Sequence, residues 1–164
     1  MPESLSLNLA RPDDLEELLE ALLGKKIEAK RYPPGQLVDG QGLVATYHDE
    51  GGVLRAVIRS DRPVVNGCGA ALSMIPVGAV EDANDEKEIP SNMFDNYREV
   101  LNIMASLFND KRQRAEHVRL RDVFFTDEIP AEVEELLAQT THRLDVTISV
   151  GGGYGSGGLA LVAR

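Results

Sequence analysis

The sequence has little of what disulfide-stabilised or membrane-spanning proteins need. Its single cysteine, Cys68, cannot form a disulfide within the chain and fits a reducing compartment such as the cytoplasm. Glycines and alanines surround Cys68, which is typical of a small packed residue rather than of a nucleophile. No run reaches the roughly 18 apolar residues of a membrane-spanning helix, and the N-terminus lacks the basic start of a signal peptide. We therefore expect a cytoplasmic protein with no membrane partner.

Basic residues are scarce relative to acidic ones. Seventeen Lys and Arg stand against 27 Asp and Glu, so the formal net charge is −10 and we expect no nucleic-acid partner, because phosphates would be repelled. Five basic residues nevertheless cluster within eleven positions and are called the basic patch: Lys111, Arg112, Arg114, Arg119 and Arg121. The basic patch either neutralises the negative end of a preceding helix and continues into a solvated strand, or forms a docking surface for an acidic partner.

Several familiar kinds of site are also missing. The sequence contains no recognisable nucleophile triad, and His48, His117 and His142 are too scattered for a metal site, so we expect no cofactor or metal of the chain's own. The glycine-rich run at 151–158 has no lysine and is followed by a strand, unlike a phosphate-binding loop. We predict a flexible hairpin loop there, and a small-ligand site in this loop is a third functional possibility beside the two described below.

The composition that remains is that of one globular domain over 1–164, with 43% hydrophobic and 27% charged residues. We expect residues 1–11 to be a loose lead-in. Apolar periods and capping signals predict helices over 12–23, 91–110 and 131–139, with another starting near 61–63. Alternation predicts strands over 26–32, 42–48, 53–59, 116–126, 143–150 and 159–163.

The order of these elements predicts an α+β fold with an antiparallel-rich sheet and helices packed on one face. Lysines and a following Pro-Pro pair favour an edge position for the strand at 26–32. The apolar end of the strand at 116–126 favours burial on both sides, and 78–90 is expected to contain an acidic loop.

The segment 91–110 has the clearest helical period. One stripe is apolar and comprises Tyr97, Val100, Leu101, Met104, Leu107 and Phe108. A second stripe, nearly opposite, comprises Asp95, Glu99, Asn102, Ser106 and Asn109. This polar stripe contains no Lys or Arg, and small residues next to Asn102 leave room for another molecule to approach its amide. The stripe is either an ordinary solvated face or a functional site.

The spacing Asp95-x3-Glu99-x2-Asn102, within DNYREVLNIMASLFN, resembles the signature helix of the CheC, CheX and FliY chemotaxis phosphatases. That motif has Asp or Ser, then Glu four residues later, then Asn three residues further on. The order of elements over about 42–164 is similar to the single-site, CheX-like version. The sequence departs from the family at Phe125, where a proline is common, and at Ser106, where glycine is frequent. The N-terminal helix carries no second Glu-x2-Asn.

The resemblance implies a phosphatase that acts on the aspartyl phosphate of a CheY-like response regulator, which carries its own Mg²⁺. Asn102 would orient the attacking water, a task that suits a neutral carboxamide, and Glu99 would anchor the regulator. The further partner-binding residues would be Asp95, Ser106, Arg112 and Arg114. The alternative is a catalytically inactive, CheC-like adaptor that binds a regulator or signalling partner. A homodimer through an exposed edge strand is compatible with both.

Overall fold

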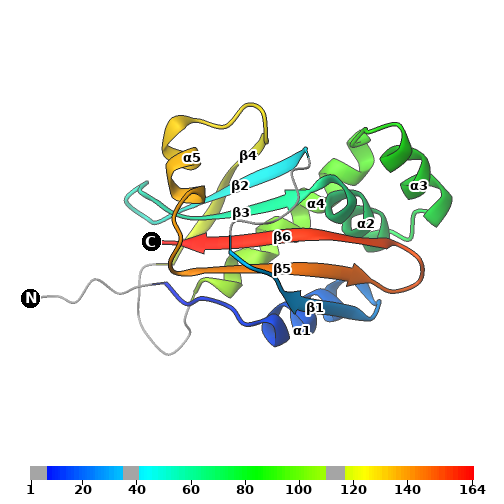
Figure 1. The fold of residues 1–164 in the computed structure, drawn as a ribbon, viewed down its shortest axis with the longest axis horizontal. Coiled ribbons are helices and arrows are strands. Elements are labelled where there is room, and N and C mark those ends of the chain that lie inside the picture. Colours follow the sequence, from blue (N-terminus) through cyan, green and yellow to red (C-terminus); the bar gives the residue numbers. More distant parts are fainter. Residues whose placement is uncertain (1–6, 35–40, 110–116) are drawn as a thin grey trace, which may run out of the picture.

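One six-stranded antiparallel sheet forms the centre of the computed structural model, which describes residues 7–34, 41–109 and 117–164 (Figure 1). The strands lie in the order β1-β5-β6-β3-β2-β4, and each neighbouring pair is antiparallel. Their bounds are β1 Ile27–Arg31, β2 Gly42–His48, β3 Leu54–Asp61, β4 Arg119–Phe125, β5 Arg143–Val150 and β6 Gly155–Ala163. The predicted α+β fold with an antiparallel sheet is therefore confirmed.

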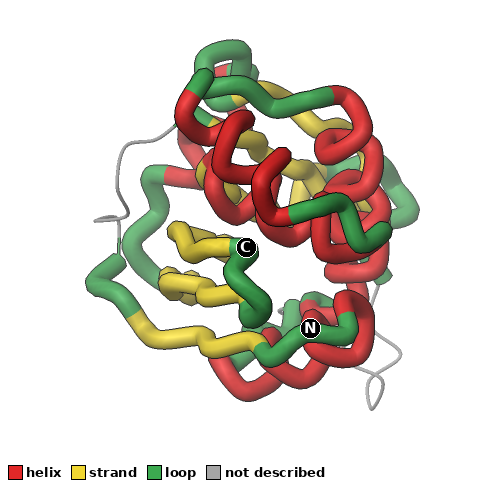
Figure 2. Tube along the Cα trace, turned by 90° about the vertical axis from the view of Figure 1, so that its right-hand side faces the viewer, coloured by secondary structure: helices red, strands yellow, loops and turns green. Residues whose placement is uncertain are grey.

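Most of the helices lie on one side of this sheet, as Figure 2 shows. The bounds are α1 Pro12–Leu23, α2 Arg62–Leu72, α3 Val77–Asp85, α4 Ser91–Met104 and α5 Ala131–Leu137, with a 3-10 helix η1 at Ala105–Leu107 directly after α4. Helices α1, α2 and α4 share the main hydrophobic core with the sheet, and α3 packs on α2. The expected packing of helices on one face thus holds for the main layer, while α5 covers a small part of the other face.

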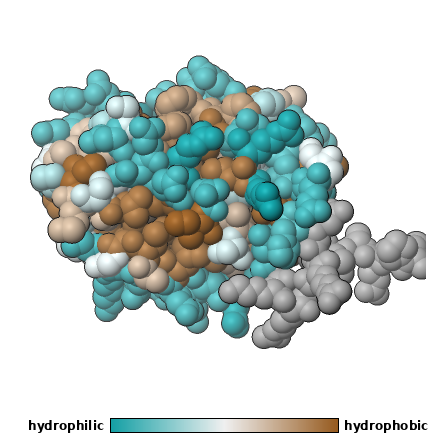
Figure 3. Space-filling model, turned by 180° about the vertical axis from the view of Figure 1, so that it is seen from behind, coloured by the Kyte–Doolittle hydropathy of each residue, from teal (hydrophilic) through white to brown (hydrophobic). Residues whose placement is uncertain are grey.

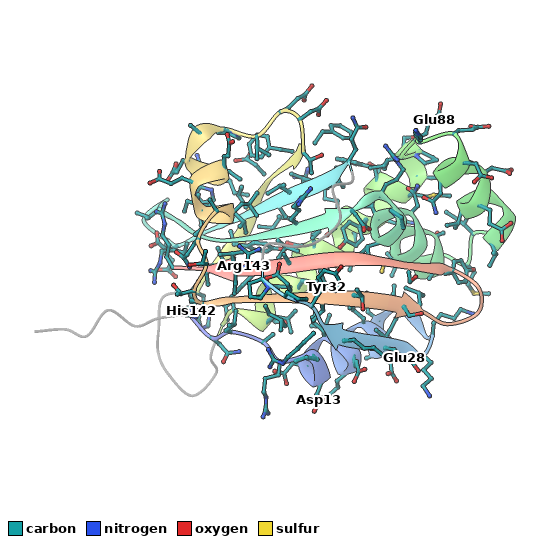
Figure 4. The ribbon with its side chains drawn as sticks, in the orientation of Figure 1. Asp13, Glu28, Tyr32, Glu88, His142 and Arg143 are labelled. Atoms are coloured by element: carbon teal, nitrogen blue, oxygen red, sulfur yellow. The ribbon has the colours of Figure 1, made fainter. Side chains whose placement is uncertain are left out.

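Alternation along the central strands divides the interior into two clusters. Ala45 and Ile58 point into the main core under α2 and α4, whereas Val44 and Val57, their neighbours in sequence, point toward α5. Arg143 fastens this second layer, because its guanidinium donates to the carbonyls of 137 and 139 at 2.8 and 2.7 Å at the end of α5 (Figure 4). The same side chain forms a 2.7 Å ion pair with the buried Asp145.

Local signals in the sequence correctly locate several boundaries. Gly24 ends α1 with φ of +68°, a conformation that strains other residues, and Gly52 has φ of +81° in the turn between β2 and β3. Asp61 caps α2 by accepting a hydrogen bond from the Val64 amide at 3.1 Å. The strand β1 lies at an edge of the sheet, as its lysines predict.

Two expected loops are ordered elements. Within the lead-in, the expectation of a loose segment is wrong for residues 7–10: Leu7 and Ala10 are buried, and the Asn8 amide donates to the Phe108 carbonyl at 3.0 Å. Residues 1–6 lie outside the described part of the chain. The predicted acidic loop is also wrong for 77–85, which form α3, because Val80 and Ala83 lie one turn apart and are both buried.

The glycine-rich run connects β5 and β6 as the predicted hairpin, but its second half is strand and only 151–154 form a turn. Residues 151–154 form the turn, and 155–158 pair with β5 as the start of β6. Gly158 donates to the Asp61 carboxylate at 2.6 Å. A Cβ at Gly67 would lie 2.6 Å from the Tyr154 carbonyl oxygen, so glycine there lets α2 approach the turn. The glycines therefore serve close backbone packing.

The end of β4 is more exposed than its apolar sequence predicts. β4 pairs with β2 and forms the edge of the sheet, so one side has no neighbouring strand among the described residues. Phe125 is 45% exposed and stacks on Phe94, with ring centroids 5.8 Å apart. The expectation of burial on both sides is wrong because an apolar run does not reveal which strand is central.

Candidate functional site

The helix α4 presents the predicted polar stripe outward. Asp95, Glu99, Asn102 and Ser106 are exposed, while the opposite apolar stripe is buried against the sheet and α2. By ideal helix geometry Glu99 and Asn102 lie about 4.5 Å apart along the axis and about 60° apart around it. The carboxylate and the carboxamide therefore look out side by side from one helical surface.

Asn109 does not belong to this surface, although its position in the sequence predicts that it does. The α-helix ends at Met104 and the chain continues as η1, which changes the direction of the residues that follow. Asn109 is half-buried and exchanges two hydrogen bonds with Val118, at 2.9 and 3.2 Å. Its amide is thus used to join the end of the helix to the chain leading into β4.

Glu99 and Asn102 are not held by any described residue of their own chain. Among the described residues, no side-chain hydrogen bond or ion pair involves either of them. Ser106, by contrast, donates to the Ile103 carbonyl at 3.0 Å. An exposed carboxylate and amide with their bonding capacity directed to solvent are available to bind a second molecule.

The backbone beneath the two side chains is fixed by buried hydrogen bonds. The Tyr47 hydroxyl donates to the Leu101 carbonyl at 2.6 Å, and the Tyr97 hydroxyl lies 2.6 Å from Ser60 Oγ. The first contact holds Leu101, the residue before Asn102, and the second holds Tyr97, two residues before Glu99. A surface site gains precision when it stands on such a rigid element.

A third set of hydrogen bonds joins α4 to α2. The Asn96 side-chain amide donates to the Gly69 carbonyl at 2.8 Å and to Ser73 Oγ at 2.6 Å. A Cβ at Gly69 would overlap the Met93 carbonyl, so glycine permits the two helices to lie very close together. The interface of α2 and α4 therefore fixes the part of α4 that precedes Glu99.

Burial changes the acidity of several groups beneath the site. Loss of solvation raises the pKa of the Tyr47 and Tyr97 hydroxyls well above their ordinary value and raises the pKa of the Cys68 thiol to about 12. It also raises the pKa of Asp61, although hydrogen bonds from the amides of 158 and 64 oppose that shift. The Cys68 thiol is buried and protonated, which agrees with a packing role.

The structure describes only some of the remaining residues of the predicted site and of the basic patch. Arg112 and Arg114 lie outside the described residues, as does Lys111, so the position of most of the basic patch stays a prediction. Arg119 and Arg121 are exposed on β4. Within the described ranges, no group of three or more His, Cys, Asp and Glu could hold a metal ion. No helix in this part of the chain combines the length and apolar character needed to cross a bilayer.

Two exposed residues beside the polar stripe were not singled out from the sequence. Arg98 precedes Asn102 by four residues, so it lies one turn away and brings a positive charge to the border of the stripe. Ile103 is 41% exposed and directly follows Asn102. The helical period carried a signal for both: Arg98 lies one turn before Asn102, and Ile103 falls outside the apolar stripe, next to Glu99.

The fold is that of several solved flagellar and chemotaxis proteins. The FliM middle domain from Vibrio alginolyticus aligns with a TM-score of 0.59 and 12% identity, over 93% of this chain and 88% of that one. FliM in the FliM–SpeE complex from Helicobacter pylori aligns with a TM-score of 0.59 and 7% identity, over 93% of this chain and 81% of that one. CheX in the CheX–CheY–BeF3–Mg²⁺ complex from Borrelia burgdorferi aligns with a TM-score of 0.52 and 11% identity, over 93% of this chain and 94% of that one.

These likenesses confirm the predicted CheC/CheX-type fold. Identities of 7 to 12% show the fold alone and do not transfer an activity. No protein-family model and no curated protein sequence matches the chain. The class is thus set by the architecture, and the function has to be argued from the surface of α4.

Proposed function

We propose that the protein is a CheX-like phosphatase that hydrolyses the aspartyl phosphate of a CheY-like response regulator in the cytoplasm. One observation carries the proposal: Glu99 and Asn102 stand side by side on an exposed, internally clamped helix, without a described partner in their own chain. The fold shared with CheX, whose structure was solved together with CheY, BeF3 and Mg²⁺, supports the same assignment.

The chemistry that we assign to Asn102 is the positioning of a water molecule. The water oxygen attacks phosphorus in line with the acyl-phosphate bond, that bond breaks, and the products are inorganic phosphate and the free aspartate of the regulator. The Asn102 carbonyl accepts a hydrogen bond from the water, and the neutral amide adds no negative charge beside the phosphoryl group. The Mg²⁺ belongs to the regulator, so the chain needs no cofactor of its own.

Glu99 has a different role in this proposal, because it holds the substrate protein. Its carboxylate is exposed one turn before Asn102 and can pair with a lysine on the regulator. Asp95 and Ser106 continue the same surface on either side. Arg98 lies at the border of the stripe, where a guanidinium can attract the phosphoryl oxygens.

Phosphate release tests both roles. With a phosphorylated response regulator of the source organism as substrate, we expect Asn102→Ala to lower kcat by about 10² or more and to leave binding intact. We expect Glu99→Ala to act mainly on KM, because it removes a docking contact. Glu81→Ala, an exposed glutamate on α3, is the matched control and should leave both constants unchanged. Equal rates for wild type and Asn102→Ala would remove Asn102 from the mechanism.

A second candidate is an adaptor that uses the same surface without catalysis. It is favoured by the likeness to FliM, which was solved in a complex with SpeE. An adaptor would bind its partner equally in the phosphorylated and unphosphorylated states and would release no phosphate. A homodimer is compatible with either candidate, since β1 and β4 form the two edges of the sheet. Sedimentation velocity would detect it.

A further inference from the structure

A hydrophobic groove runs between α1 and the end of α4, next to the proposed site. It has a volume of about 520 Å³ and its floor is apolar, formed by Leu18, Ala21, Leu22, Ile103 and Leu107. Figure 3, which views the molecule from behind the sheet, shows a contiguous hydrophobic area ringed by hydrophilic residues on the helical face. Contiguous apolar surfaces with a polar rim are typical of protein interaction sites.

The groove and the polar stripe are two parts of one surface. Ile103 directly follows Asn102, and Leu107 directly follows Ser106, so the wall of the groove is the helical line next to the stripe. Ile103 also lies one turn after Glu99. A molecule that places its phosphoryl group at Asn102 therefore reaches the groove within one helical turn.

The acidic residues around the groove favour a partner with basic residues. Its two charged lining residues, Asp14 and Glu17 on α1, are both acidic, and Glu99 stands on the α4 side. Asp13 adds another carboxylate on α1 and projects outward (Figure 4). A second copy of this chain would bring the same acidic rim and a net charge of −10 to the contact, which disfavours self-association through this face. A partner that carries lysine or arginine around an apolar side chain is complementary.

We infer that the α1–α4 groove is the docking site of the response regulator, and that it receives an apolar side chain of the regulator flanked by basic residues. This inference rests on the proposed function, and it assigns partner recognition to α1 as well as to the motif helix. Ile103 is the central contact, because it is large, apolar and exposed beside the reacting position. Glu17 supplies charge attraction at the rim.

Binding and turnover separate this inference from the proposed function. The probe is a set of the organism's CheY-like receiver domains, loaded with beryllofluoride and Mg²⁺ for binding, and phosphorylated for turnover. We expect Ile103→Glu to weaken binding and raise KM by at least tenfold, with kcat changed less than twofold. Val53→Glu is the matched control: Val53 is also an exposed aliphatic residue, at 51%, but lies in the β2–β3 turn. It should change neither constant.

The charge contribution has its own pair of variants. Glu17→Lys should lower the association rate about threefold or more, with an effect that shrinks in high salt, whereas Glu81→Lys on α3 should not. Thermal melting establishes that all variants are folded. Ile103→Glu tests whether the groove binds the regulator, and Asn102→Ala tests whether Asn102 acts in catalysis.

The possible results are distinct. If wild type hydrolyses the phosphate and Ile103→Glu has an unchanged KM, the groove inference is overturned while the phosphatase stands. If wild type binds a receiver domain without turnover and Ile103→Glu loses that binding, the groove is supported and the catalytic proposal fails. A wild-type dimer that Ile103→Glu converts to a monomer would assign the groove to a second copy and overturn the inference. So would the absence of binding to every receiver domain.

Discussion

Removing one buried hydroxyl tests how the structure holds the helix α4. Tyr47→Phe deletes the 2.6 Å hydrogen bond from the Tyr47 hydroxyl to the Leu101 carbonyl. The amide of Ala105, the usual helical donor to that carbonyl, bonds instead to the carbonyls of 102 and 103 where α4 passes into η1, so we expect the Leu101 carbonyl to depend on the hydroxyl. The ring itself keeps its contact with Phe108, since the centroids lie 5.2 Å apart and the hydroxyl takes no part in that packing.

The expected cost follows from burial. Tyr47 and Leu101 are both 0% exposed, so water cannot replace the lost donor without rearrangement. Leaving a buried carbonyl unpaired costs about 1–3 kcal/mol. For a chain of this size, about 2–4 °C of melting temperature corresponds to each kcal/mol, which predicts a decrease of roughly 2–12 °C. The loosened junction lies three residues from Asn102, so we also expect slower phosphate release.

The assay compares Tyr47→Phe with Tyr154→Phe. Tyr154 is also a mostly buried tyrosine whose hydroxyl donates to a carbonyl, that of Ile75, at 2.8 Å, but it lies outside α4. Both variants should lose stability in thermal and urea unfolding. Only Tyr47→Phe should increase amide hydrogen exchange at residues 105–108 and lower kcat.

Two results would refute this reasoning. A melting temperature for Tyr47→Phe within 1 °C of wild type would show that the Leu101 carbonyl does not depend on the hydroxyl. Faster exchange at 105–108 in both variants to the same extent would show that the effect comes from general destabilisation and not from the α4–η1 junction.

Three further predictions concern the core around α2. Cys68, with its pKa raised to about 12, should be thiolate to only about 10⁻⁴ at pH 8, so we expect negligible reaction with Ellman's reagent until urea unfolds the protein. The pKa of Asp61 is raised above 3.8 in the folded state, so its contribution to stability is complete below that pH and is lost as pH rises through the raised value. In urea titrations the stability of wild type relative to Asp61→Asn should therefore fall with rising pH, and a constant difference would contradict this. Gly69→Ala places a methyl group against the Met93 carbonyl and should cost about 1–3 kcal/mol, whereas Gly78→Ala, at an open helical position, should be neutral or stabilising by up to about 1 kcal/mol; equal effects in unfolding experiments would show that α2 and α4 are not in close contact.

The candidate site was readable from the sequence because a helix maps positions onto faces by a fixed angle. The period of α4 assigned Asp95, Glu99 and Asn102 to the exposed face, and the structure agrees. The same rule failed at Asn109, since the change from α-helix to 3-10 helix after Met104 alters that angle. The period leaves Ile103 outside the apolar stripe, but it could not show that α1 lies opposite Ile103 and completes a groove.

The strands, the main helices, the caps at Gly24 and Asp61 and the outward polar stripe were determined by the sequence alone, because each depends on residues a few positions apart. Three features were decided only by the tertiary structure. Residues 155–158 are strand, paired with β5 and bound to Asp61 through the Gly158 amide, and Phe125 stayed exposed because β4 is an edge strand. The groove beside Asn102 exists because α1 and α4, about eighty residues apart, pack on the same face of the sheet. Such contacts join distant segments, and no local period can encode them.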